Sequence, residues 1–204
     1  MKTLLPKRRK KQRIEESDLR EDGLKIGVWD CETTGLNASF GYLLTVGIKP
    51  IGGKPKVLRI DDFEHYEERP WDDRFLAYAA KKELERYDVL VSYNGARYDI
   101  PFLNTRLVEA GIKPLSRDIK HADLYKTVKA RLRMHSGRLA ALTEFLQTKD
   151  RKTPLTPLVW RRAGAGDTKS LNVIAKHNLH DLTTLEECFN KLVGLMDVRF
   201  TYVD

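Results

Sequence analysis

Apolar residues along the chain alternate between short β-branched runs and longer stretches with helical spacing. The short runs predict strands, which lie at 24–30, 40–49, 56–60, 88–93 and 121–125. Helical spacing predicts helices at 71–86, 100–110 and 139–146, with one or two more over 170–195. Residues 149–166 are rich in Pro, Gly and basic residues and are predicted to form a loop. This order indicates an α/β fold, with a mixed sheet flanked by helices.

Charge separates the N-terminal segment from the rest of the 204-residue chain. Residues 1–13 hold seven of the 37 Lys and Arg residues and no acid, which leaves 30 basic residues against 29 acidic ones elsewhere. We therefore expect residues 1–22 to be a disordered basic tail and residues 23–204 to form one domain. The tail either holds nucleic acid loosely through phosphate contacts or is a solvated arm without a role.

Several protein classes are excluded or disfavoured by composition. No apolar run approaches the roughly 18 residues of a membrane span, and Leu4 and Leu5 run directly into Pro6 rather than into a signal-peptide core. The two cysteines, Cys31 and Cys188, form no CxxC pair, so neither a zinc site nor a disulfide framework is expected. A cytoplasmic location in a reducing compartment follows as the expectation.

Three short acidic motifs are candidates for a site. Asp30 and Glu32 are two residues apart at a strand end, so both side chains point to one face while Cys31 points away. Asp99 follows an Asn-Gly turn at the start of a helix, where an ordinary N-cap is the simpler interpretation. His177 and Asp181 are four residues apart on one helix face, a spacing that surface pairs also show. None of the three motifs identifies a site alone.

Taken in order, the three motifs resemble those of DEDD (DnaQ-like) exonucleases: D-x-E-T first, N-G-x-x-Y-D-x-P-F-L in mid-chain and H-x-x-x-D near the end. The resemblance extends over about residues 24–195 and is strongest to the YprB-like branch, related to the proofreading domains of family B DNA polymerases. Residues 142–146, 152–154 and 166–167, with Trp160, also look like that branch. The resemblance implies a ribonuclease-H-like mixed sheet of five to six strands flanked by helices. It assigns the four acids to Asp30, Glu32, Asp99 and Asp181.

The sequence departs from the family at the general base. Family members with a tyrosine base carry it four residues before the last acid, and members with a histidine base carry it five before. This chain has His177 at the tyrosine position and Lys176 at the histidine position. We expect His177 to orient or deprotonate the attacking water, because an imidazole pKa near 6.5 suits that role. The alternative is a helix residue that only hydrogen-bonds Asp181.

Four carboxylates in one site predict divalent cations. A like pair about 4 Å apart costs about 4 kcal/mol at an effective dielectric near 20, and cations remove that penalty. Oxygen ligands favour hard ions, so two Mg²⁺ or Mn²⁺ ions are the expected cofactors, held by Asp30, Glu32, Asp99 and Asp181. Such a pair can activate water and stabilise the leaving oxygen. Asp30 is the candidate bridging ligand, Asp123 a supporting residue or a plain strand-end acid, and His180 structural.

Substrate contacts are expected on both sides of the acids. Candidates are residues that follow the first strand, the residues of the second motif, and a basic stretch over 126–138 that could follow phosphates or be only a solvated helix face. In order, they are Thr33, Thr34, Gly35, Leu36, Asn94, Tyr98, Lys126, Arg131 and Arg138.

The function that these features favour is a 3′–5′ exonuclease acting on single-stranded DNA, or on RNA. The alternatives are a structure-selective endonuclease of ribonuclease-H or resolvase type and a nucleic-acid-binding module whose catalysis has lapsed. The complete acid set argues against the lapsed enzyme. The expected protein partner is a polymerase or another replication or repair protein. No association with a membrane is expected.

Overall fold

The computed structural model describes residues 23–149 and 155–196. Its centre is a mixed five-stranded sheet with the strand order β3-β2-β1-β4-β5. The strands are β1 (Ile26–Thr33), β2 (Leu43–Pro50), β3 (Lys56–Arg59), β4 (Val89–Ser92) and β5 (Lys120–Asp123). β1 pairs antiparallel with β2 and parallel with β4, so β1 lies at the middle of the sheet. The predicted α/β fold with a mixed sheet is thereby confirmed.

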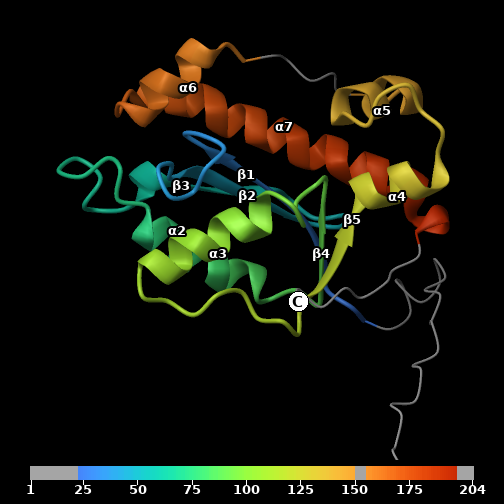
Figure 1. Cartoon of the computed structure of the whole chain (residues 1–204), viewed down its shortest axis with the longest axis horizontal. Coiled ribbons are helices and arrows are strands. Elements are labelled where there is room, and N and C mark those ends of the chain that lie inside the picture. Colours follow the sequence, from blue (N-terminus) through green and yellow to red (C-terminus); the bar gives the residue numbers. More distant parts are fainter. Residues whose placement is uncertain (1–22, 150–154, 197–204) are drawn as a thin grey trace, which may run out of the picture.

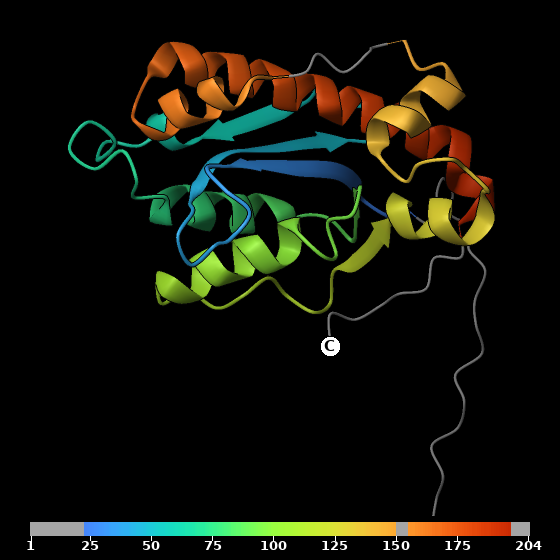
Figure 2. The same cartoon turned by 45° about the horizontal axis from the view of Figure 1, so that its top comes forward.

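Helices cover both faces of the sheet (Figures 1 and 2). The longest helix, α7, crosses one face with α6 beside it, and α2 and α3 cover the other, while α4 and α5 lie toward the end at which β5 ends. The helices are α2 (Arg74–Leu84), α3 (Asp99–Glu109), α4 (Leu124–Arg131), α5 (Leu139–Leu146), α6 (Pro157–Gly164) and α7 (Thr168–Leu192), with short 3₁₀ helices η1 (Ile60–Asp62) and η2 (Val193–Leu195). No helix in the described ranges has the length and apolarity to cross a membrane.

Two apolar clusters make up the core. Trp29 of β1 and Leu103 of α3 belong to the first, whereas Val28 of β1 and Leu182 of α7 belong to the second. Neighbouring β1 residues enter different clusters because side chains alternate along a strand. Alternation in β1 therefore places Asp30 and Glu32 on the same face as Val28, toward α7.

The predicted strand at 40–49 begins three residues late, at Leu43. Residues before it form a compact turn in which the Gly41 N–H donates to the Asn37 carbonyl at 2.8 Å. Phe40 is consequently 89% exposed rather than part of the sheet.

The loop predicted at 149–166 is wrong over α6, and the strand predicted at 121–125 is wrong at its end. Pro157 occupies the first turn of α6, where a missing N–H costs nothing and the fixed φ favours helix entry. The strand ends at Asp123, whose side chain accepts from the Tyr125 N–H at 3.0 Å and so begins α4. Residues 1–22 and 152–154, which carried further predictions, lie outside the described residues, and the domain boundary at residue 23 stays a prediction.

A buried ion pair ties the two helices of the α2–α3 layer to the sheet. Asp73 is fully buried and accepts from Arg106 Nε at 2.9 Å, from Arg106 Nη2 at 2.8 Å and from the Leu43 N–H at 2.8 Å. The Arg106 side chain is only 11% exposed. These bonds fix the start of β2 against both helices, because Asp73 precedes α2 and Arg106 belongs to α3.

We predict that Asp73→Ala lowers the free energy of unfolding by about 3–5 kcal/mol, because the buried Arg106 guanidinium loses Asp73 and retains the pair with Glu109, whose side chain is 59% exposed, while the Leu43 N–H loses its acceptor. Urea denaturation followed by circular dichroism measures this change. Arg86→Ala is the control, since it removes a surface pair with Glu83 in which the Arg86 side chain is 71% exposed, and it should leave the midpoint almost unchanged. Equal shifts for the two variants would contradict the role given to Asp73.

Candidate active site

The acids of the first motif lie near the C-terminal end of β1, facing α7. Glu32 is the cross-strand partner of Thr45 in β2, and Asp30 is the partner of Gly47. The β1–β2 register shifts between Glu32 and Thr33, where Leu44 of β2 is skipped. Such a bulge bends a strand and redirects its side chains. The regular ladder therefore ends where Glu32 presents its carboxylate.

His177 and Asp181 meet Glu32 from α7. His177 Nε2 lies 3.6 Å from Asp181 Oδ2 and 4.0 Å from Glu32 Oε1. One ligand atom from each of the three residues lies within 4.8 Å of the others. The His177 side chain is 8% exposed, whereas Lys176, the alternative position for a base, is exposed. The helix thus turns His177, and not Lys176, toward the acids.

Asn178 holds Asp30, and sequence reasoning missed it. Its Nδ2 donates to Asp30 Oδ2 at 2.9 Å, and the residue is fully buried. This contact requires Gly47, because a Cβ there would lie 2.3 Å from Asn178 Oδ1 and 2.9 Å from Leu182. The signal in the sequence was faint: a glycine inside an apolar strand indicates a close approach of another element.

Asp99 reaches β1 from the start of α3. Its Oδ1 accepts from the Cys31 backbone N–H at 3.3 Å and from Cys31 Sγ at 3.1 Å. Burial raises the pKa of Asp99 to about 6, against the opposing effect of the Cys31 hydrogen bonds. Burial also raises the pKa of the Cys31 thiol well above its usual value, and the negative charges of Asp99, Asp30 and Glu32 add to the effect. Cys31, predicted only to point away from the site, therefore anchors its second motif.

The turn before Asp99 is held by β5. Asp123 Oδ1 accepts from the Asn94 N–H at 2.7 Å, and its Oδ2 accepts from the Ala96 N–H at 3.2 Å. Gly95 permits the tight path, since a Cβ there would lie 2.2 Å from Ser92 Oγ and 3.0 Å from Asp99 Oδ2. Asn94 has a left-handed φ of 65°. In this geometry Asp123 supports the turn that positions Asp99.

The structure therefore brings the three motifs to the end of β1, but their acids do not all contact one another. Glu32, His177 and Asp181 form the compact group, Asp30 lies on the same face and bonds to Asn178, and Asp99 bonds to Cys31. His180 is exposed on α7.

The predicted substrate residues after β1 form a closed loop. Thr34 Oγ1 accepts from the Tyr42 N–H at 3.0 Å, and the Thr34 N–H donates to the Tyr42 carbonyl at 3.0 Å. The hydroxyls of Thr33 and Tyr98 lie 2.6 Å apart, and each bonds to the Gly35 carbonyl, at 2.8 and 2.9 Å. Leu36 is 87% exposed at the top of this loop. Tyr98 thus links the loop to the second motif.

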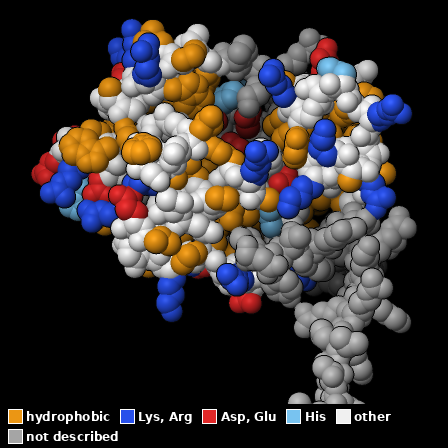
Figure 3. Space-filling model, in the orientation of Figure 1, with side chains coloured by type: hydrophobic (Ala, Val, Ile, Leu, Met, Phe, Trp, Pro, Cys, Tyr) orange, Lys and Arg blue, Asp and Glu red, His pale blue; other side chains and the backbone are white. Residues whose placement is uncertain are grey.

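The basic candidates lie on and after α4. All are exposed, and they are Lys126, Lys129, Arg131, Arg133 and Arg138. Figure 3 shows Lys and Arg side chains over the part of the surface that α4 and α5 form.

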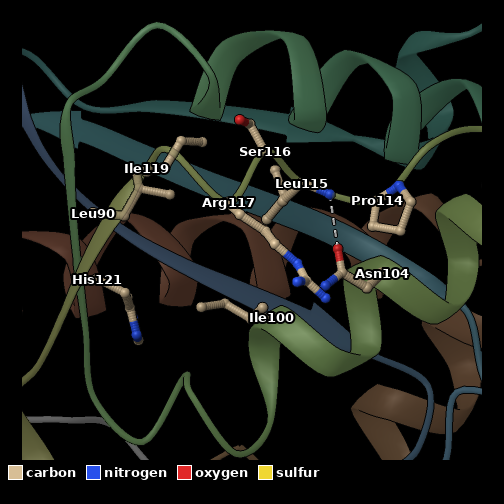
Figure 4. Close-up of a pocket in the computed structure, with 9 residues that line it drawn as sticks. All are labelled: Leu90, Ile100, Asn104, Pro114, Leu115, Ser116, Arg117, Ile119 and His121. Carbon is tan, nitrogen blue, oxygen red and sulfur yellow. Dashed lines mark hydrogen bonds between the residues drawn. The ribbon is translucent and has the colours of Figure 1, made fainter. Parts of the chain in front are cut away.

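A cavity of about 200 Å³ lies on the α3 side of β4 and β5 (Figure 4). Leu90, Ile100 and Leu115 give it apolar walls, and Arg117 and His121 are among its polar lining residues. His121 Nε2 bonds to Ser92 Oγ at 2.8 Å, and burial lowers the pKa of His121 to about 4. None of the four acids lines this cavity, so it is distinct from the acid group.

The acid group fits a divalent cation by its donor chemistry. Carboxylate oxygens and one imidazole nitrogen converge there, which are common ligands of divalent metals. One buried oxygen atom on the strand position across from Glu32, Thr45 Oγ1, has no hydrogen-bond partner among the described residues. Buried polar atoms are almost always satisfied, so a bound ion with its water is consistent with this hydroxyl.

Comparison with known proteins identifies the family. The model of the RNase_H superfamily matches residues 28–193, and the chain belongs to that superfamily. Among solved structures, the fold is similar to the family B DNA polymerase from the hyperthermophilic archaeon Pyrobaculum calidifontis, with a TM-score of 0.70 and 16% identity. The similarity covers 89% of this chain but only 26% of that polymerase chain. A search of curated proteins finds no match. Membership of this superfamily supports a nuclease-type activity on nucleic acid, and the acid group could hold a divalent metal.

We predict that Gly47→Ala displaces α7 from β1 and releases Asp30 from Asn178, because the added methyl group collides with the Asn178 amide. Divalent-metal affinity should fall at least about 10-fold, as expected when a residue that orients a ligand is removed. Isothermal titration with Mn²⁺ measures the decrease. Gly194→Ala is the control, since nothing lies within 4 Å of its added Cβ. Unchanged affinity in Gly47→Ala would refute this account of the α7 contact.

Proposed function

We propose that the chain is a metal-dependent 3′–5′ exonuclease that hydrolyses phosphodiester bonds of single-stranded nucleic acid, DNA in preference to RNA. The observation that carries the proposal is the convergence of Glu32, His177 and Asp181 within 4.8 Å at the end of β1. Asp30 lies two residues before Glu32 on β1 and bonds to Asn178. Asp99 of α3 accepts a hydrogen bond from the backbone N–H of Cys31, the residue between Asp30 and Glu32. Membership of the RNase_H superfamily supports this assignment.

The residues divide the chemistry among them. Asp30, Glu32, Asp99 and Asp181 would hold Mg²⁺ or Mn²⁺, and two such ions supply an activated water and stabilisation of the leaving oxygen. Asn178 fixes the Asp30 carboxylate, and the Cys31 N–H fixes that of Asp99. His177 places an imidazole nitrogen against two carboxylates, where it can accept a proton from the attacking water or bind an ion directly.

Exposed apolar side chains on the loop that follows β1 suit a single-stranded end. Leu36 and Phe40 project from the loop that follows β1, with 87% and 89% of their surface exposed. A base can stack on an aromatic side chain such as Phe40, and Leu36 offers it apolar contact. Leu36 and Phe40 would hold the terminal nucleotides of a frayed strand, with Thr33, Thr34 and Gly35 shaping the loop and Tyr98 bonded to it. Asn94 of the second motif would be a further contact.

The first test is digestion of 5′-labelled single-stranded DNA and its RNA counterpart with Mg²⁺, Mn²⁺ or EDTA. We expect a metal-dependent ladder that shortens from the 3′ end. Asp30→Asn should lower the rate at least about 100-fold while substrate binding persists, because a metal ligand is removed. Asp118→Asn is the matched control, because Asp118 is an exposed acid outside the three motifs, and this variant should cleave at the normal rate.

Other outcomes of that digestion decide between functions. Internal cuts without a ladder would replace the exonuclease with an endonuclease. Binding without cleavage under either metal would refute the catalytic proposal and leave a nucleic-acid-binding module.

The basic surface of α4 gives a separate prediction. In the Asp30→Asn background, Lys126→Ala with Arg131→Ala should weaken binding of single-stranded DNA. The slope of log K against log salt should become shallower by about 0.7 for each phosphate that these side chains no longer neutralise. Fluorescence anisotropy at several salt concentrations measures both. Lys54→Ala with Lys113→Ala removes the same charge from exposed positions elsewhere, and an equal effect there would show that only net charge matters.

A further inference from the structure

His177 departs from the residue type expected at its position, and its surroundings show what the change can do. Its Nε2 lies between two carboxylates, 3.6 Å from Asp181 Oδ2 and 4.0 Å from Glu32 Oε1. These separations exceed the 2.7–3.2 Å of an N–H···O hydrogen bond. The contacts of His177 with these two oxygens are therefore not direct hydrogen bonds.

The same separations suit three atoms that share one ion. Ligands about 2.1 Å from a metal lie roughly 3.0 Å apart at right angles, 3.4 Å apart at the tetrahedral angle and 4.2 Å apart when opposite. The two His177 distances fall in that interval, and all three ligand atoms lie within 4.8 Å of one another. The two His177 separations are thus compatible with atoms that share one ion.

We infer that His177 is a direct metal ligand, which together with Glu32 and Asp181 forms a mixed nitrogen and oxygen site. The inference rests on the metal dependence in the proposed function, but it concerns only the ligand set. Thr45 supports it independently. The Thr45 hydroxyl is fully buried on the strand position across from Glu32 and has no hydrogen-bond partner among the described residues, so it can bond to a water held at this site.

A nitrogen ligand changes the preferred ion. Mg²⁺ favours oxygen ligands and retains its waters, whereas imidazole suits transition metals. The site should consequently select Mn²⁺ over Mg²⁺ more strongly than four carboxylates would. His177→Asp converts it to an oxygen-only site and should shift the ratio of the two affinities toward Mg²⁺.

Electron spin-echo envelope modulation of the full chain loaded with Mn²⁺ alone tests the inference directly. Wild-type protein should show the modulation of a coordinated imidazole ¹⁴N nucleus, and His177→Gln should lose it, with Mn²⁺ affinity lowered about 10- to 100-fold. His180→Gln is the matched control, because this exposed histidine lies three residues further along the same helix. Circular dichroism establishes that each variant folds.

The outcomes separate this inference from the proposed function. Bound Mn²⁺ without nitrogen modulation, modulation that survives in His177→Gln, or no Mn²⁺ binding at all would each overturn the ligand role of His177. A nitrogen signal from protein that cleaves no nucleic acid would uphold the ligand and refute the nuclease. Cleavage without the nitrogen signal would uphold the nuclease and overturn the ligand role of His177.

Discussion

The approach of α7 to the centre of the sheet is the constraint on which the site depends. The helix comes so close that β2 has no side chain at Gly47, and the Asn178 amide fills the space and bonds to Asp30. One helical turn of α7 then presents His177 and Asp181 to Glu32. If α7 lay farther away, the same residues would be present but could not share an ion.

A second contact brings the mid-chain motif to the same strand. Asp99 bonds to the Cys31 backbone and thiol from the α3 side, while Asp123 of β5 and the small size of Gly95 hold the preceding turn. The acids are therefore gathered around β1 from both layers of helices. Burying carboxylates in this way is unfavourable for the ionised forms, as the raised pKa of Asp99 shows, and sites that accept this cost are commonly functional.

Position and residue type have separate consequences at His177. The helical spacing aims the residue at the acids, whatever its identity, and leaves Lys176 exposed. Its imidazole then brings a nitrogen donor into a site otherwise made of oxygen. The chain keeps the architecture of the RNase_H superfamily, and under the ligand role proposed for His177 this one side chain would alter which ions the site accepts.

The sequence by itself determined the mixed sheet, the main helices and the acids of the candidate site, because period-2 and period-3.6 patterns and short motifs are local properties. It missed α6, where composition suggested a loop, and it extended β2 into the turn that exposes Phe40. The Asn178–Asp30 and Cys31–Asp99 bonds could not be predicted from local patterns, because they join residues 148 and 68 positions apart, and Gly47 indicated only that some element comes close. Only tertiary packing decided those contacts, because the distance between α7 and β1 depends on all the side chains packed between the helix and the sheet.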